Sequence, residues 1–297
     1  MSTTTVKSGL LGLLGLGLAM LRVPRLMSFY KKRTLLKRLK TADVIVVSIS
    51  KSGRTWLRAM LSRYYQTKFS LPETELLEFD NLHQLNANVP RILFIHAGDL
   101  LRLLPEKTHL ANRRVVHLVR WPIDTSVSQY FQASGRTTAF RRGLVGLPVN
   151  IADLTIHDFV SSSSHGVDTL VQKLNDIYVY MADHAALLTL RYEDARKDPA
   201  LTLREFLVFS GESPTDEAIQ LATAATQFDK LKKAESEGHF SSWRLRPKNK
   251  QNANSFKVRR GKVGGYRDYF SEQESSALER KVRGELNPFY GYKEFPL

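Results

Sequence analysis

The feature that most constrains this chain is the segment from Asp43 to Tyr64, where a run of β-forming residues breaks at a Ser/Lys/Gly turn and resumes with helical spacing. This order predicts a strand, a phosphate-binding loop and a helix. Backbone N–H groups in such a turn, together with the positive end of the following helix, bind phosphate without a large pocket. We therefore expect a nucleotide or a similar phosphorylated ligand.

The loop departs from the nucleoside triphosphatase pattern GxxxxGK[ST]. Ser48 stands where the first glycine belongs, Gly53 is in place, Arg54 replaces the phosphate-binding lysine, and Lys51 lies inside the loop. The chain also lacks a confident apolar strand that ends in a magnesium-binding aspartate, which such enzymes use. These departures argue against an ordinary nucleoside triphosphatase. A phosphotransferase that uses ATP and magnesium is kept as the alternative interpretation.

The loop KSGRTW resembles the KSGTTW loop of sulfotransferases that use 3′-phosphoadenosine 5′-phosphosulfate (PAPS). This resemblance implies that the chain takes a sulfuryl group from PAPS and releases 3′-phosphoadenosine 5′-phosphate (PAP). The loop residues that it assigns to the cofactor are Lys51, Ser52, Gly53, Arg54, Thr55 and Trp56.

A second block, from Val115 to Phe131, resembles the 3′-phosphate block of the same family, with Arg120 and Ser128 at the matching positions. A guanidinium at a strand end and a hydroxyl in the next helix can converge on one phosphate. An ion pair of Arg120 with a carboxylate such as Asp124 is the simpler alternative.

Three later blocks complete the resemblance. They are RYEDARKDP, the TQF triplet that matches the family's TSF, and VRRGKVGGY, which matches the RKGxxGDW lid. In the lid, Gly265 replaces the family's acid and Tyr266 its tryptophan. The residues that these blocks assign to the cofactor are Tyr192, Thr226, Phe228, Arg259, Arg260 and Gly261.

Sulfuryl transfer to a hydroxyl requires a base for the hydroxyl proton and a cation for the charge on the leaving group. His96 follows the apolar stretch RILFI, aligns with the histidine of the family's KTHLP segment, and has a suitable ordinary pKa. The resemblance assigns Lys51 as the catalytic cation. A histidine that only caps strand hydrogen bonds is the alternative for His96, and His117 is expected to be a core residue. Two residues depart from the family's pattern. Phe94 stands where the family usually has a second lysine near the base, and Arg54 stands where it has a threonine.

The fold class is α/β, a single P-loop-type domain over residues 41–297 with a central parallel sheet flanked by helices. The nucleotide would lie at the carboxyl edge of that sheet. Without cysteines or metal-ligand spacing of the histidines, no metal site is predicted. Strands are expected at about 43–50, 91–96, 115–120 and 187–192, alternating with helical patterns.

Residues 1–40 form an N-terminal extension, with an apolar stretch from Gly9 to Leu21 followed by many basic residues. The stretch is shorter than the roughly 20 residues that span a bilayer. Together with the net charge of +15, it predicts a cytoplasmic protein that attaches peripherally to an anionic membrane surface. A helix packed on the domain and a disordered tail are the alternatives.

No nucleic-acid recognition signature accompanies the positive charge. The acceptor is expected to bear a hydroxyl, and composition does not separate lipids, glycolipids, glycans and small molecules. A non-catalytic nucleotide-binding protein at a membrane is the remaining alternative, because the lysine that Phe94 replaces is missing.

Overall fold

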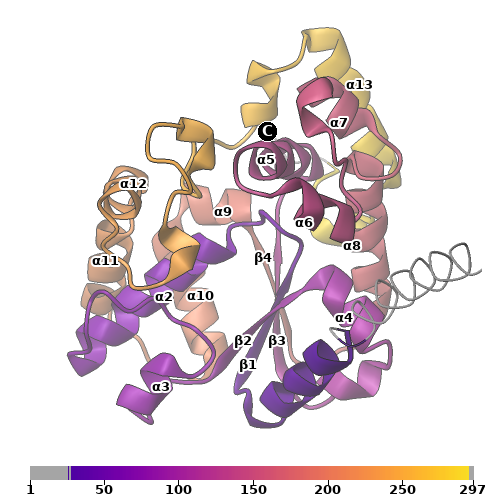
Figure 1. The fold of residues 1–297 in the computed structure, drawn as a ribbon. Helices are drawn as coiled ribbons and strands as arrows, with labels where there is room; N and C mark the ends of the chain where they lie inside the picture. Colours follow the sequence, from indigo (N-terminus) through magenta and orange to yellow (C-terminus); the bar gives the residue numbers. More distant parts are fainter. Residues whose placement is uncertain (1–25, 27, 294–297) are drawn as a thin grey trace, which may run out of the picture.

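Four parallel strands form one sheet in the order β2-β1-β3-β4, at the centre of a computed structural model that describes residues 26 and 28–293 (Figure 1). The expected parallel sheet is confirmed, with each strand within two residues of its predicted ends. The strands are β1 (Val44–Ser48), β2 (Ile92–His96), β3 (Arg114–Val119) and β4 (Leu187–Arg191).

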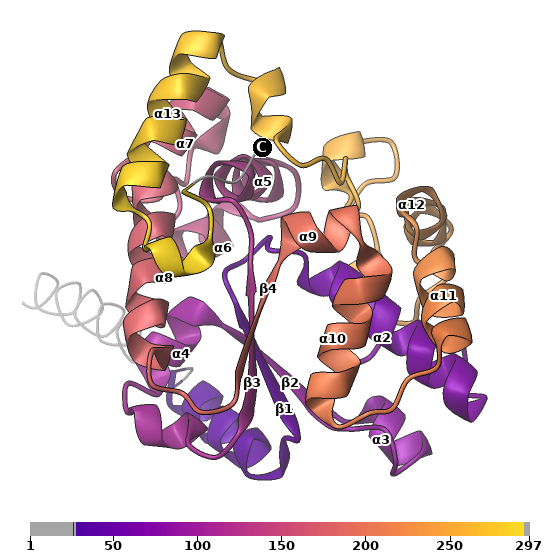
Figure 2. The ribbon, with the colours of Figure 1, turned by 180° about the vertical axis from the view of Figure 1, so that it is seen from behind.

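Helices cover both faces of the sheet, as the sequence predicted (Figures 1 and 2). A further helix runs through residues 28–41. The labelled helices are α2 (Arg54–Phe69), α3 (Asn81–Leu85), α4 (Ala97–Leu103), α5 (Pro122–Gly135), α6 (Ala139–Leu144), α7 (Ile156–Ser161), α8 (Val167–Met181), α9 (Tyr192–Lys197), α10 (Pro199–Ser210), α11 (Asp216–Ala225), α12 (Phe228–Glu237) and α13 (Glu272–Glu285).

The two faces of the sheet make separate cores, because successive side chains of a strand point to opposite sides. In β1, Ile45 and Val47 pack with residues of α4, α5 and α8. Val44 and Val46 pack with residues of α2, α10 and α11 on the other face. All five residues of β1 are buried, which explains its continuous β-branched run.

Helix ends follow local sequence signals. The Asp198 side chain accepts a hydrogen bond from the Leu201 backbone N–H, Pro199 is the first residue of α10, and Gly211 ends this helix with φ of 96°. Ser271 and Glu274 form a capping box at the start of α13.

The carboxyl ends of the four strands meet at one edge of the sheet. Ser48 of β1 pairs in register with His96 of β2 and with Leu118 of β3. Val119 of β3 pairs with Arg191 of β4. The loop after β1, the end of β2, and the residues that follow β3 and β4 therefore lie close together, although they are far apart in the sequence.

Within the residues that the structure describes, no helix is long and apolar enough to cross a membrane. The apolar stretch from Gly9 to Leu21 lies outside the described residues.

Candidate active site

The loop between β1 and α2 has the backbone of an anion-binding turn. Lys51 and Gly53 adopt positive φ values of 76° and 96°, and α2 begins directly after them with no acidic residue in its first turn. The positive end of this helix is therefore not neutralised locally. A Cβ atom at Gly53 would lie 2.7 Å from Cδ2 of Tyr192, so both the conformation and the contact require glycine.

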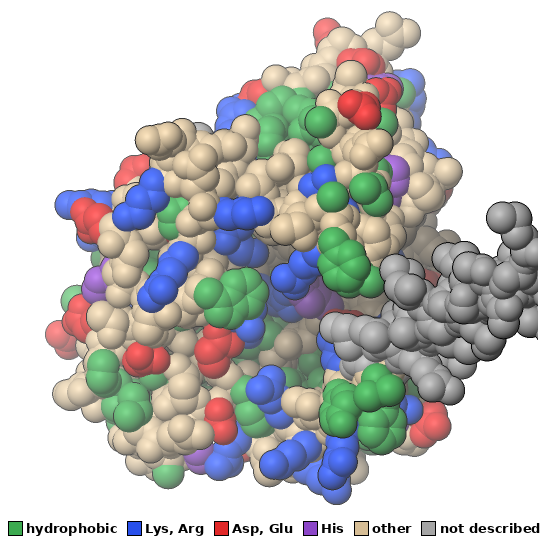
Figure 3. All heavy atoms as spheres, viewed as in Figure 1, with side chains coloured by type: hydrophobic (Ala, Val, Ile, Leu, Met, Phe, Trp, Pro, Cys, Tyr) green, Lys and Arg blue, Asp and Glu red, His purple; other side chains and the backbone are tan. Residues whose placement is uncertain are grey.

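A cavity opens over this loop at the carboxyl edge of the sheet. Most of the predicted cofactor residues line it, and Lys and Arg side chains surround a hollow on the face shown in Figure 3. The predicted residues in its wall are Lys51, Gly53, Arg54, Thr55, Trp56, Arg120, Ser128, Tyr192, Phe228, Arg259, Arg260 and Gly261.

Two predicted cofactor residues are absent from the wall of this cavity. Ser52 is buried, and the hydroxyl of Thr226 donates to the Ala222 carbonyl 2.9 Å away, inside its own helix end. The Thr226 carbonyl accepts a hydrogen bond of 3.0 Å from the indole of Trp56. In this structure, Thr226 therefore acts on the site by holding Trp56.

Arg120 joins three parts of the site. Its guanidinium donates to the Lys51 carbonyl (3.2 Å), lies 4.3 Å from the centre of the Tyr192 ring, and approaches Asp124 at 3.8 Å. Asp124 itself accepts the backbone N–H groups of Gly264 (2.8 Å) and Tyr266. The ion pair of Arg120 with Asp124, considered above as the simpler alternative, is therefore present. Arg120 also lines the cavity, so the ion pair and a role in phosphate binding are compatible.

The lid segment, residues 257–265, places its basic residues beside α5 and aromatic rings. Arg259 lies 3.8 Å from the centre of the Phe131 ring and donates to the Tyr269 hydroxyl at 2.6 Å. Arg260 donates to the same hydroxyl. A Cβ atom at Gly261 would lie 2.6 Å from Cδ2 of Phe228, so glycine allows the lid backbone to lie against this ring.

A buried carboxylate that the sequence analysis missed fixes the lid. Glu235 of α12 accepts the backbone N–H groups of Lys257 (2.7 Å) and Val258 (2.9 Å), and forms an ion pair with Arg136 at 3.5 Å. The lid residues lie more than twenty positions away in the sequence, and Glu235 belongs to none of the recognised blocks. Glu235 lies in a helix whose sequence is rich in charged residues, so nothing in the local sequence indicates that this carboxylate is buried.

Three cavity-lining cations were also missed, namely Arg196, Lys257 and Lys262. Burial, followed by the charges of Arg136 and Arg54, lowers the pKa of Lys257 to about 8. Burial lowers the pKa of Lys51 too, followed by the charges of Lys257 and Arg120. The positive charges around Lys51 and Lys257 repel one another and favour the neutral amines. A bound anion would favour the charged ammonium forms instead, so this cluster suits an anionic ligand.

His96 ends β2 on the same side of the sheet as α2. The Nη2 atom of Arg54 lies 2.5 Å from its Nε2 atom. Close packing around the imidazole and then the Arg54 charge lower the pKa of His96 to about 3, although the residue keeps an exposed surface. The lowered pKa leaves the imidazole neutral at neutral pH.

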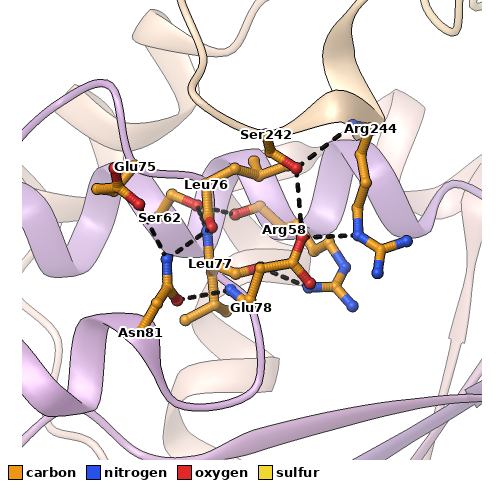
Figure 4. A network of polar contacts seen from close by, with 9 residues as sticks. All are labelled: Arg58, Ser62, Glu75, Leu76, Leu77, Glu78, Asn81, Ser242 and Arg244. Atoms are coloured by element: carbon orange, nitrogen blue, oxygen red, sulfur yellow. Dashed lines mark hydrogen bonds and ion pairs between the residues drawn. The ribbon is translucent and has the colours of Figure 1, made fainter.

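Phe94, two residues before His96 in β2, packs against Arg58 of α2, and Glu78 binds that arginine. The Arg58 guanidinium lies 3.8 Å from the centre of the Phe94 ring, where the family resemblance led us to expect a lysine. Glu78 binds Arg58 at 3.3 Å and Arg244 at 2.6 Å, and it accepts the Ser242 hydroxyl (Figure 4). This network ties α2 to two loops from distant parts of the chain.

Several other sequence-based expectations concern histidines and metals. His117 is 1% exposed in β3, which confirms it as a core residue, and burial lowers its pKa to about 3. In residues 26 and 28–293, no group of three or more His, Cys, Asp or Glu side chains is arranged to hold a metal ion.

The cavity suits a nucleotide with several phosphate groups. Cations outnumber carboxylates in its wall, and Nε of Arg120 is buried without a hydrogen-bond partner in the part of the chain that the structure describes. Glycines at 53 and 261 let aromatic rings approach the backbone. The residues present therefore fit PAPS on their own geometry.

Comparison with known proteins agrees with this geometry. A family model described as the sulfotransferase domain matches residues 41–288. Flavonol 3-sulfotransferase of Flaveria bidentis is 24% identical and covers 82% of this chain and 81% of its own. Cytosolic sulfotransferase 17 of Arabidopsis thaliana is 27% identical, with 82% and 75% covered.

Solved structures share the fold. Retinol dehydratase in complex with retinol and PAP has a TM-score of 0.57 at 18% identity, over 82% of this chain and 80% of that one. A mouse sulfotransferase complexed with PAP has a TM-score of 0.54 at 17% identity, over 89% and 94%. Together, the family model and the relatives show that this chain belongs to the family of PAPS-dependent sulfotransferases.

Proposed function

We propose that this enzyme transfers the sulfuryl group of PAPS to a hydroxyl of its acceptor, with His96 as the general base and Lys51 as the catalytic cation. The observation that carries this proposal is the register of β1 and β2. Ser48 and His96 are paired in the sheet, so the phosphate loop and the imidazole lie at the same edge, where Arg54 lines the cavity and also contacts His96.

PAPS, when bound, supplies the sulfuryl group and leaves as PAP. The residues that would hold it are the backbone of the loop at 51–55, Arg120 and Ser128 after β3, and Arg259 and Arg260 of the lid. Tyr192, Trp56 and Phe228 supply aromatic surface beside them; the Trp56 and Tyr192 rings lie 6.0 Å apart. Fixing these groups before the reaction is what allows them to act electrostatically.

His96 acts on the acceptor. Its neutral imidazole can accept the hydroxyl proton at a ring nitrogen as the oxygen attacks sulfur, and then carries that proton as imidazolium. Lys51 places a compact positive charge in the loop, where it can stabilise the negative charge on the departing phosphate. A hydroxyl acceptor also agrees with relatives whose names refer to flavonols and hydroxysteroids.

The test is a thermal shift of the purified protein with PAP, beside ATP with magnesium. A ligand at 100 times its dissociation constant stabilises the folded state by about 2.7 kcal/mol. Selective stabilisation by PAP supports the site and justifies an acceptor screen with radiolabelled PAPS. A preference for ATP with magnesium, or no response from folded protein, would contradict the assignment of Arg120, Ser128 and Arg259.

We also propose that the enzyme is cytoplasmic and that residues 1–40 form an extension that binds anionic membrane surfaces peripherally. In the described part of this extension, Leu26, Phe29 and Tyr30 are 55%, 63% and 60% exposed, and basic residues follow. Exposed apolar groups next to Lys and Arg favour an anionic leaflet. Co-sedimentation with phosphatidylserine vesicles but not phosphatidylcholine vesicles is expected, and equal recovery with both would contradict it.

A further inference from the structure

Arg54 links the cavity to the candidate base, because it lines the cavity and contacts His96. Arg54 reaches His96 from the first turn of α2, so its guanidinium lies where an acceptor hydroxyl has to arrive. The equivalent family position carries a threonine in the KSGTTW loop, which is too short to make this contact. Arg54 therefore adds a charge to the acceptor side that the family resemblance does not account for.

The positive charge at this point lacks a carboxylate partner. Among the described residues, no carboxylate lies within ion-pair distance of the Arg54 or Lys257 side chains, whereas nearby Arg58 and Arg244 share Glu78. Burial and the charge of Arg244 lower the pKa of Arg54 to about 10. Both Arg54 and Lys257 line the cavity and both lower the pKa of His96, so among the described residues two cations without an ion-pair partner act on the base.

Resting on the function proposed above, we propose that the acceptor is an anionic hydroxyl compound, whose carboxylate, phosphate or sulfate group binds Arg54 and Lys257 while its hydroxyl meets His96. A planar guanidinium binds such a group through two parallel hydrogen bonds. Lys257 adds a point charge that Glu235 positions through the backbone. The donor does not need this pair, because the loop, Arg120 and the lid arginines already provide cations for its phosphates.

Binding of an anion also has a consequence for the base. The charged groups that face His96 are Arg54 from α2, Asp99 from α4, Lys31 from the helix at 28–41, and Lys257 from the lid segment. Asp99 is paired with Lys31 at 2.7 Å, so the charge of Arg54 is the least compensated. When an acceptor anion neutralises Arg54, the imidazole regains basicity. An anionic acceptor would therefore both bind and improve the base that deprotonates it.

The test compares related hydroxyl acceptors with and without an anionic group, using the full chain and saturating PAPS. Three matched pairs serve as probes: 4-hydroxybenzoate and its methyl ester, 3-hydroxybutyrate and its methyl ester, and glycerol 3-phosphate and glycerol. Hydrogen bonds to charged groups imply a preference of about 10- to 100-fold in kcat/KM for the anionic member of at least one pair. Thermal shift of the PAP-saturated protein with each probe reports binding separately from turnover.

Variants then assign the preference to Arg54. Arg54→Thr should reduce it to about threefold or less, and Arg54→Lys should retain part of it, because the charge remains but the fork geometry is lost. Arg280→Thr removes one exposed positive charge from α13 and should leave the preference unchanged. With Arg54→Thr, the pH dependence of kcat should also become the same for both members of a pair.

Failure of this inference is distinguishable from failure of the proposed function. If PAP stabilises the protein but the two members of every pair give equal responses, including no response from either, the acceptor charge is wrong and the sulfotransferase assignment stands. An anionic preference that survives Arg54→Thr would also overturn it. Loss of PAP binding in the wild-type protein would overturn the proposed function and this inference together.

Discussion

The donor side and the acceptor side of this cavity are built in different ways. On the donor side, the loop at 49–53 and the lid segment contribute backbone conformation, with glycines at 53 and 261 against aromatic rings. Near the base, His96 and Phe94 lie on β2, Arg58 of α2 lies over the Phe94 ring, and Glu78 ties Arg58 to Arg244.

Both sides depart from the family resemblance, but the departures affect different kinds of contact. Phosphate recognition by backbone N–H groups depends on a local fold, which a short motif encodes. Recognition of an acceptor depends on side chains that can change one at a time while the sheet stays intact. The donor side keeps the loop and lid glycines although Gln227, Gly265 and Tyr266 depart from the family motifs, whereas Phe94 and Arg54 change the side chains nearest the base.

The largest effect that separates the two sides is expected from His96→Ala. Loss of the base should lower kcat by about 10²- to 10⁴-fold, while the thermal shift caused by PAP should remain. Radiolabel transfer from PAPS measures the first quantity and thermal unfolding the second. If PAP binding falls together with kcat, the imidazole belongs to the donor side and the division is wrong.

Glu235→Ala tests whether the donor side depends on a residue outside its motifs. Removing this carboxylate leaves two lid N–H groups without their acceptor and Arg136 without its ion-pair partner, although Arg136 still donates to the Ser255 and Arg246 carbonyls. Breaking a buried charge pair typically costs about 3–5 kcal/mol, so urea unfolding should show a clear loss of stability and PAP should bind more weakly. Glu237→Ala is the matched control on α12, where an exposed carboxylate only approaches Lys233 at 3.8 Å; a comparable loss there would refute the argument.

Gly53→Ala is expected to have a smaller effect, confined to the donor side. The new Cβ would meet Tyr192 at 2.7 Å and the residue would keep a φ of 96°, which together cost about 1–3 kcal/mol. PAP affinity should fall because Tyr192 supports Arg120. Gly284→Ala in α13 has open space around the new atom and should stabilise the protein by about 0.4–1 kcal/mol. Equal results for the two variants would show that the loop tolerates a side chain.

The sequence could predict the features that depend on local patterns, but not the contacts between segments that are far apart in the chain. The strands and the loop could be predicted because hydrophobic runs and glycine positions are local signals, and Arg120, Tyr192 and Gly261 were identified because they stand in blocks that resemble the family's motifs. Glu235 and Lys257 were not, since their roles arise from α12 packing on a lid segment more than twenty residues later. The contact of Arg54 with His96 also joins residues 42 positions apart, and no sequence period encodes a side-chain direction across that distance.

The pH dependence of turnover gives the smallest effect and tests the acceptor side directly. A histidine acts as a base only when it is neutral, and the neutral fraction falls as the pH drops below its pKa. Close packing and Arg54 hold the pKa of His96 to about 3, so with a neutral acceptor kcat/KM should not lose its base between pH 7.5 and pH 5.5. Arg54→Thr removes one of these two causes and moves the pKa upward, toward the ordinary value near 6.5.

The variant should therefore lose about two- to fourfold of its kcat/KM over the same interval, whereas Gly53→Ala on the donor side should keep the wild-type profile. Parallel profiles for wild type and Arg54→Thr would mean that burial alone sets the pKa of His96, and that the charge of Arg54 acts on the acceptor without acting on the base.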